Sequence, residues 1–236
     1  LHHNGLGRIQ VDPPGGLFLV KMERFQVVPA WLVWLVPEGD PARAFTNFHR
    51  PLLAPGGDLR EPSHFRCRFT PARAVLELEH EGWRVETLCE TVAGAAAVRM
   101  RVTVENRGTR ERALAVMPAL RPYAAAANLA PWDVPELYHH TSYTGGPGHT
   151  FLLRAMSPGG KPAERHNVVC VSDLAAERMA LDYTHFTGGG SWERPEAVVR
   201  HDAAAWREPG PVEIRGRRAV FALRRELRLA PGAGLT

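Results

Sequence analysis

Residues 98–105 read Val-Arg-Met-Arg-Val-Thr-Val-Glu, so every second side chain is apolar. Successive side chains of an extended strand point to opposite faces, and this alternation therefore predicts a strand with one buried and one solvated face. The same period of two recurs at residues 64–69, 112–120 and 221–229. Segments rich in glycine and proline, such as Pro55-Gly56-Gly57-Asp58, punctuate the chain and predict turns. The pattern indicates a mainly β protein built from antiparallel strands.

The chain has 236 residues, long enough for one large β domain with a substantial core. We therefore expect residues 1–236 to form a single antiparallel β-sandwich with a few short helices. Short helices are expected at residues 173–178 and 193–199. In the strand at 64–69, Phe65, Cys67 and Phe69 should share the core side, and Trp31 and Trp34 should lie in the core.

Charge, cysteine spacing and the length of apolar runs argue against several classes of function. The formal net charge is +4, and the arginines that carry it are scattered along the chain rather than gathered in one run. This distribution is untypical of nucleic-acid binding. Three widely spaced cysteines, Cys67, Cys89 and Cys170, indicate neither a disulfide framework nor a zinc site, so we expect buried thiols in a cytoplasmic protein. No apolar run approaches the ~18–20 residues that cross a membrane, and we expect no membrane association.

Two stretches then resemble a known family. Residues 82–87 (Gly-Trp-Arg-Val-Glu-Thr) are followed by the strand at 98–107 and the strand at 114–120, and residues 183–197 (Tyr-Thr-His-Phe-Thr-Gly-Gly-Gly-Ser-Trp-Glu-Arg-Pro-Glu-Ala) precede a strand that closes in Pro-Gly. In order and spacing these motifs resemble the N-terminal β-sandwich of the family 94 glycoside phosphorylases, formerly family 36 glycosyltransferases. The family includes cellobiose, cellodextrin and chitobiose phosphorylases and part of cyclic β-1,2-glucan synthase. One departure is Gly189, which stands where the family usually has arginine.

The resemblance implies a supersandwich fold similar to galactose mutarotase. In the members that it resembles, a linker and an (α/α)6 barrel follow the sandwich, and the barrel carries the catalytic aspartate. We therefore expect this chain to be a fragment without its own catalytic residue. It would support and bind carbohydrate within an enzyme acting on β-linked glucosides. No cofactor is implied, and inorganic phosphate would be the co-substrate of the full enzyme. The implied partners are an oligosaccharide or sugar phosphate, the missing barrel and a second copy in a homodimer.

Candidate sugar-binding residues fall in two segments. Rings pack on the apolar face of a pyranose while neighbouring polar groups bind its hydroxyls. A long loop at 122–149 and the glycine-rich stretch at 183–194 hold such mixtures. Trp132 and Trp192 have two interpretations, a sugar-binding ring or a ring packed in the core, because tryptophan is often buried. The three glycines before Ser191 also have two interpretations: their backbone N–H groups bind an anion, or they form a turn that needs positive φ angles. The full set is Trp132, Asp133, His140, Tyr143, His185, Ser191, Trp192 and Arg194.

No metal site is expected, because His139, His140 and His149 lack the spacings of known metal sites. Other functions stay open beside the phosphorylase-like one. A stand-alone carbohydrate-binding module predicts a polar surface with one aromatic platform. A mutarotase-like sugar epimerase predicts a histidine and a carboxylate that converge over a concave face. The phosphorylase-like domain instead predicts an apolar flank where the barrel docks. A purely structural immunoglobulin-like module fits less well, because the expected strands exceed seven.

Overall fold

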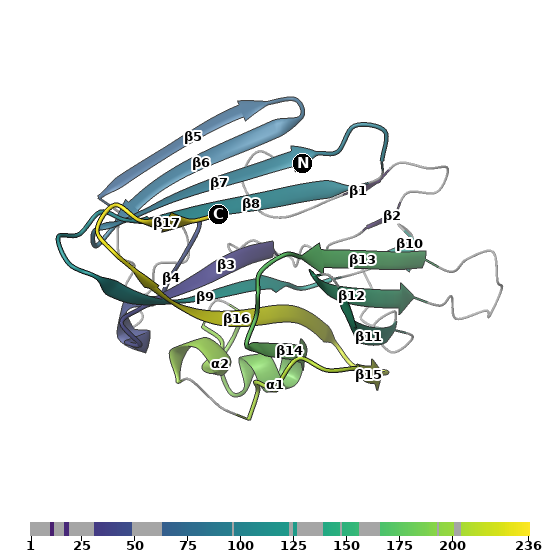
Figure 1. The fold of residues 1–236 in the computed structure, drawn as a ribbon. Helices are drawn as coiled ribbons and strands as arrows, with labels where there is room; N and C mark the ends of the chain where they lie inside the picture. The colour runs from purple at the N-terminus through teal and green to yellow at the C-terminus, as the bar shows by residue number, and fades with distance from the viewer. Residues whose placement is uncertain are drawn as a thin grey trace.

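The structure is a computed structural model that describes residues 10–11, 17–18, 31–48, 63–95, 97–122, 125–126, 139–146, 148–155, 166–192, 194–200 and 204–236. Strands dominate it, and all the strand pairs are antiparallel (Figure 1). Two five-stranded sheets face each other, and a four-stranded sheet lies beside them. The predicted mainly β supersandwich is confirmed.

The five-stranded sheet that lies uppermost in Figure 1 is called the upper sheet. Its strands follow the order β17-β8-β7-β6-β5, and the first and last of these form its edges. Chain neighbours pair in sequence from β5 to β8, so this sheet is a meander that the C-terminal strand joins. The bounds are β5 (His64–Thr70), β6 (Arg73–His80), β7 (Trp83–Thr91), β8 (Val98–Asn106) and β17 (Gly234–Leu235).

The second five-stranded sheet, called the central sheet, packs on partners across both faces. Its order is β14-β16-β9-β3-β4. The strands are β3 (Trp31–Pro37), β4 (Phe45–Thr46), β9 (Arg112–Leu120), β14 (Arg178–Asp182) and β16 (Ala219–Leu229). Three short helices accompany them, namely η1 (Pro41–Arg43), α1 (Tyr183–Thr187) and α2 (Glu196–Val199).

The four-stranded sheet follows the order β13-β12-β11-β15. It consists of β11 (His139–Gly146), β12 (Gly148–Ala155), β13 (His166–Ser172) and β15 (Val212–Arg215). A small three-stranded sheet contains β1 (Gln10–Val11), β2 (Leu17–Phe18) and β10 (Ala125–Ala126).

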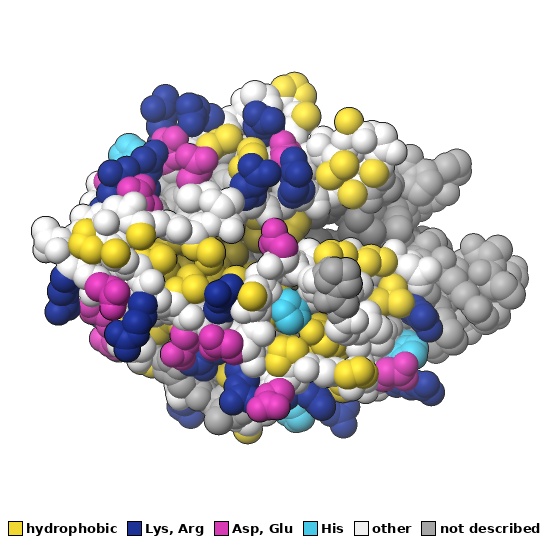
Figure 2. Space-filling model, in the orientation of Figure 1, with side chains coloured by type: hydrophobic (Ala, Val, Ile, Leu, Met, Phe, Trp, Pro, Cys, Tyr) yellow, Lys and Arg dark blue, Asp and Glu magenta, His cyan; other side chains and the backbone are white. Residues whose placement is uncertain are grey.

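The alternation read from the sequence sets the layers. On β3, Val33 and Leu35 face the upper sheet, where they meet the buried Trp83 and Leu78. Leu32, Trp34 and Val36 point to the opposite face and join the buried helix residues, so the prediction that Trp34 lies in the core is confirmed. Trp31 is only half-buried. Apolar side chains line the seam between the two five-stranded sheets (Figure 2).

A third apolar cluster joins the central and four-stranded sheets. Phe221 of β16 stacks on Phe151 of β12, with ring centroids 4.9 Å apart. Tyr143 of β11 meets Phe151 edge-on at 5.1 Å. One face of the central sheet therefore covers two other sheets. This arrangement positions the four-stranded sheet with its second face directed outward.

Three local details differ from expectation. Residues 139–146 of the long loop expected at 122–149 form β11, and β12 begins at Gly148. Phe65 and Phe69 share the core-side face of β5 but are 38% and 47% exposed, because an edge strand has neighbours on one side only. Residues 173–177 form a connection without regular secondary structure before β14, where a helix was expected at 173–178. The helix expected at 193–199 is present but shorter, as α2. The helix α1 was not anticipated, and its N-cap is Asp182, whose Oδ1 accepts hydrogen bonds from the backbone N–H groups of Thr184 and His185.

Candidate functional site

His140 lies on the outward face of the four-stranded sheet. Its neighbours on β11, Thr141 and Tyr143, are buried at 0% and 2% exposure against the central sheet. Because strand side chains alternate, His140 and Ser142 point the other way. The outward face is therefore the surface where residues of β11, β12, β13 and β15 are free of the core.

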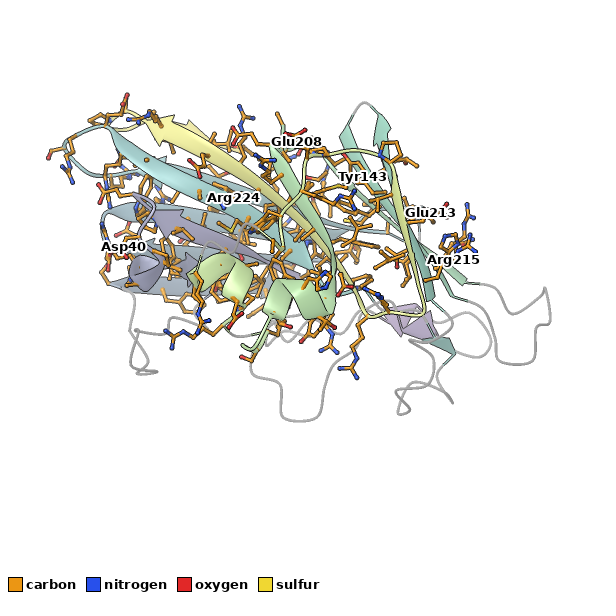
Figure 3. All side chains as sticks on the ribbon, turned by 90° about the horizontal axis from the view of Figure 1, so that it is seen from below. Asp40, Tyr143, Glu208, Glu213, Arg215 and Arg224 are labelled. Carbon is orange, nitrogen blue, oxygen red and sulfur yellow. The ribbon has the colours of Figure 1, made fainter. Side chains whose placement is uncertain are left out.

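A row of basic residues crosses this face. Arg154 of β12 pairs in register with His140, and His140 pairs with Arg215 of β15. Directly paired residues on one face have Cβ atoms about 4.5–5.5 Å apart. Three nitrogen-rich side chains therefore stand on consecutive strands. We call Arg154, His140, Arg215 and the adjacent Glu213 the outer-face cluster. Figure 3 shows Glu213 and Arg215 together at one extremity of the molecule, with Tyr143 further inward.

Glu213 balances part of this charge. Its Oε2 lies 3.1 Å from Nε2 of His140 and 3.4 Å from Nη2 of Arg215. Contact with His140, followed by Arg215, lowers the pKa of Glu213 from its ordinary value of 4.5, so the carboxylate is ionised at neutral pH. Arg154 forms no ion pair with any residue in the described part of the chain. The cluster thus combines an ionised carboxylate with a guanidinium that no described residue pairs with.

The geometry of the cluster limits its chemistry. Epimerisation of a sugar needs a base and an acid that reach the substrate from different positions. His140 and Glu213 contact each other directly, which leaves no space for a pyranose between them. The Glu213 side chain is also 56% exposed, whereas Nε2 of His140 is shielded from solvent. The arrangement suits hydrogen bonding to hydroxyl or phosphate groups better than general acid–base catalysis.

Tyr143, a second candidate on β11, serves the core instead of a surface. It is 2% exposed, and its Oη lies 2.5 Å from Nδ1 of His149. Its ring also packs against Phe151. The side chain is therefore occupied by internal contacts.

The candidate His185 lies within the helix α1, the candidate Ser191 follows it, and both are exposed. Nδ1 of His185 lies 4.0 Å from Oδ2 of Asp182, which also accepts a hydrogen bond from Arg217 at 3.0 Å. Burial raises the pKa of Asp182, but the hydrogen bonds from Arg217 and from the backbone of His185 outweigh it and the net pKa is lowered. Asp182 is thus held ionised as a helix cap.

Trp192 lies in the core beneath α1. It is 3% exposed and stacks on Tyr183 with ring centroids 6.0 Å apart, so its indole is not presented to solvent. Arg194 is half-buried. The glycines between α1 and Trp192 form a turn in which Gly188 has a φ of 57°, and a Cβ at that position would collide with the Glu196 carboxylate. A carboxylate so close to the turn disfavours an anion there and supports the turn interpretation.

The sequence also matches a known protein family. The profile of the glycosyl hydrolase 94 supersandwich domain matches residues 40–235. The chain belongs to this family. No curated protein matches the chain.

Membership explains the sheet arrangement of this family 94 supersandwich domain but assigns no role to single residues. Two sequence-predicted candidates, Trp132 and Asp133, lie outside the described residues. Of the remaining six, Ser191 and Arg194 meet through a backbone hydrogen bond of 3.1 Å in the turn around the buried Trp192, whereas His140 and Tyr143 point to opposite faces of β11. His140 instead contacts Glu213 and pairs in strand register with Arg154 and Arg215, and none of these partners was predicted from the sequence.

A signal for these partners existed in the alternation of Val212, Glu213, Ile214 and Arg215. It predicts a half-buried strand but not which strand lies beside it. The described residues of the family 94 domain contain no group of three or more histidine, cysteine or acidic side chains that could hold a metal ion. None of the helices in the described ranges is both long and apolar enough for a membrane span.

Proposed function

We propose that this chain supports and binds carbohydrate within a phosphorylase-type enzyme acting on β-linked glucosides. The observation that carries the proposal is the family 94 supersandwich match over residues 40–235. The catalytic acid would come from a barrel domain, and inorganic phosphate would be the nucleophile of that enzyme. The role of this chain is then to brace the barrel and to present polar groups to the sugar.

Exposed apolar side chains support a docking role. The large exposed hydrophobic residues of the described chain lie on two parts of the surface: Phe65, Phe69 and Val92 on the upper sheet, and Val169 and Val171 on β13. Val169 and Val171 lie two positions apart and therefore share one face of β13. Exposed apolar surface is typical of an interaction site where such residues adjoin. A polar domain that works alone would not need either patch.

The outer-face cluster supports the sugar-handling part of the proposal. Arg154, Arg215 and Glu213 offer donors and an ionised acceptor on one surface, which suits hydroxyl and phosphate groups. The outward positions described on β11, β12, β13 and β15 include no aromatic residue. A stand-alone binding module with an aromatic platform therefore fits this face poorly.

A mutarotase-like activity is the second candidate, because His140 and Glu213 provide a histidine–carboxylate pair 3.1 Å apart. Their direct contact argues against it. The two candidates are separable by assay, because a mutarotase works without a barrel or phosphate.

The test is calorimetric titration of the chain with glucose, cellobiose, N-acetylglucosamine and β-1,2-glucan oligomers, with and without phosphate. Mutarotation and phosphorolysis are assayed in the same samples. We expect weak binding and no turnover. The variant Arg154→Ala should weaken binding, whereas Arg101→Ala, a matched exposed arginine on the upper sheet, should not. Turnover by the isolated chain would overturn the supporting role.

A further inference from the structure

A partly buried contact joins the four-stranded sheet to the connection between β13 and β14. His149, near the start of β12, lies at its centre. Its Nδ1 is 2.5 Å from Oη of Tyr143, and its Nε2 accepts a hydrogen bond of 3.1 Å from the backbone N–H of Ala176. The imidazole also stacks on the Tyr143 ring, with centroids 5.9 Å apart. Three structural elements therefore converge on one imidazole.

These two hydrogen bonds define the protonation state of His149. The backbone N–H of Ala176 can only donate, so Nε2 must accept and carries no proton. The single proton of the neutral ring then lies on Nδ1 and is donated to Oη of Tyr143. A second proton would have to sit on Nε2, directly facing the N–H of Ala176. The charged imidazolium cannot keep this hydrogen bond.

The bond to Ala176 holds down residues 173–177, which we call the connecting segment. Leu174 and Ala176 of this segment pack against the apolar cluster that contains Tyr143 and Phe151. At its far end, the N–H of Glu177 donates to the carbonyl of Arg224 at 2.8 Å. At its start, the N–H of Leu174 contacts Oγ of Ser172 at 3.3 Å. The hydrogen bond from Ala176 to His149 thus attaches the middle of the connecting segment to β12.

We propose that His149 is an acid-sensitive latch: protonation of its imidazole releases the connecting segment from the four-stranded sheet and uncovers the apolar cluster beneath. The device is independent of the proposed carbohydrate function, because it uses none of the residues of the outer-face cluster.

The surroundings of His149 favour its neutral form. From β11 the titratable group is Tyr143, and burial raises its pKa, so it offers no charge to the imidazolium. From β13 the neighbours are Ser172, which pairs with His149 in register, and the thiol of Cys170, whose pKa burial raises to about 11. The acidic residues of the connecting segment, Asp173 and Glu177, are exposed and make no ion pair with the ring. Burial accordingly lowers the pKa of His149 from its ordinary value of 6.5.

The lowered pKa of His149 sets the pH range over which the latch opens. The unfolded chain binds a proton at His149 near pH 6.5, whereas the folded chain resists it. The latch is therefore fully closed above about pH 6.5, where the histidine is neutral in both states. It weakens as the pH falls below that value and opens as the pH passes through the lower pKa of the folded state.

Hydrogen exchange tests the latch most directly. Exchange of a peptide covering residues 173–178 is measured at pH 7.5 and pH 5, with times rescaled for the pH dependence of intrinsic exchange. A peptide from β9 is the internal reference. We expect protection of the connecting segment to fall at least about tenfold relative to the reference at pH 5. In His149→Gln, whose side chain keeps an acceptor but cannot be protonated near neutral pH, the protection should be unchanged by pH. The control His185→Gln, an exposed histidine, should behave like the wild type.

A measurement on the wild type keeps the proposal testable if His149→Gln fails to fold. In an NMR titration, the amide of Ala176 should shift with the same midpoint as the His149 ring and with a different midpoint from His185. An Ala176 amide that does not follow the His149 titration would overturn the latch. Acid-induced exchange that persists in His149→Gln would overturn it as well.

Discussion

The two ends of the upper sheet differ in how firmly they are attached to the rest of the protein. At the end formed by the β6–β7 turn, which we call the closed end, Leu78, Trp83 and Val85 are fully buried against the central sheet. At the opposite end, called the open end, Phe69 and Val92 are 47% and 39% exposed. Both ends belong to the same alternating strands. The difference shows that alternation assigns a side chain to a face but does not guarantee that anything covers that face.

A charged clamp holds the closed end. Arg43 of η1 contacts the carboxylates of Glu38 at 2.5 Å and Glu81 at 2.7 Å, which belong to turns of different sheets. Glu38 and Glu81 both have positive φ angles, of 54° and 49°, and each precedes a glycine. Asparagine or aspartate is usual at such positions of a turn. A positive φ angle is unfavourable for glutamate, but the glutamate side chain is longer than that of aspartate or asparagine and reaches the shared Arg43.

The largest expected effect comes from removing the aromatic anchor of the closed end. Trp83 is 0% exposed, and the Arg112 guanidinium lies 4.5 Å above its ring. Trp83→Ala should destabilise the domain by about 3–5 kcal/mol, because it leaves a large cavity. Phe69→Ala at the open end should cost less than about 1 kcal/mol. Urea unfolding of both variants measures the contrast, and equal losses would show that the two ends are equally packed.

A buried asparagine links the two five-stranded sheets. Oδ1 of Asn47 accepts a hydrogen bond of 2.6 Å from the N–H of Val33, and its Nδ2 donates to Oγ1 of Thr87 at 3.0 Å. Asn47→Ala leaves buried partners unsatisfied and should cost about 2–4 kcal/mol in the free energy of unfolding.

The variant Asn47→Asp sharpens this test, because it keeps the acceptor for Val33 and loses the donor to Thr87. We expect a loss of stability at neutral pH that shrinks when the pH is lowered and the new carboxyl is protonated. Urea unfolding at pH 7 and pH 4 provides the comparison. A loss that does not change with pH would mean that burial of the charge is not the cause.

The charged clamp should contribute less. Arg43→Ala should lower stability by about 1 kcal/mol or less at neutral pH, since the side chain is partly exposed and its pairs are screened. The hydrogen bond from Arg43 lowers the pKa of Glu38 below 4.5, so the contribution is present above about pH 4.5 and is lost as the pH falls through the folded pKa. The unfolding free energies of the variant and the wild type should therefore converge at acidic pH. A constant difference would contradict an electrostatic clamp.

The smallest effect on stability is expected at the open end. The double variant Phe69→Ser and Val92→Ser should change the free energy of unfolding by less than about 1 kcal/mol, because both side chains are already largely exposed. If this end docks on another domain, the same variant should weaken that association. Thermal unfolding of the isolated chain and its binding to a separately produced barrel domain are the two measurements. A large loss of stability in the isolated chain would show that the open end is packed within the domain itself.

The fold could be predicted from the sequence more completely than the site. Alternation at residues 98–105 gave the orientation of β8, and the order of short motifs indicated the family, because both are local properties. Phe65 and Phe69 lie on the predicted face of β5, but their exposure could not be predicted, because it depends on the opposite layer. His140 was named without its partners, since contact with Glu213 requires β11 and β15 to be neighbours although 73 positions separate the two residues along the chain. Trp192 resembled a sugar platform, but its burial depends on where α1 lies.

The sequence by itself therefore determined the strands at 64–69, 98–105, 112–120 and 221–229, their inward and outward sides, several turns and the family, because each follows from the spacing of residue types along the chain. It did not determine β11, which lies within the loop expected at 122–149. The tertiary structure alone decided which strands became edges, which glutamates share Arg43, and which two groups form hydrogen bonds with His149. These features depend on distances between segments far apart in sequence. Such distances are fixed only when the sheets pack, because the free energy of burying their apolar faces selects one arrangement of layers.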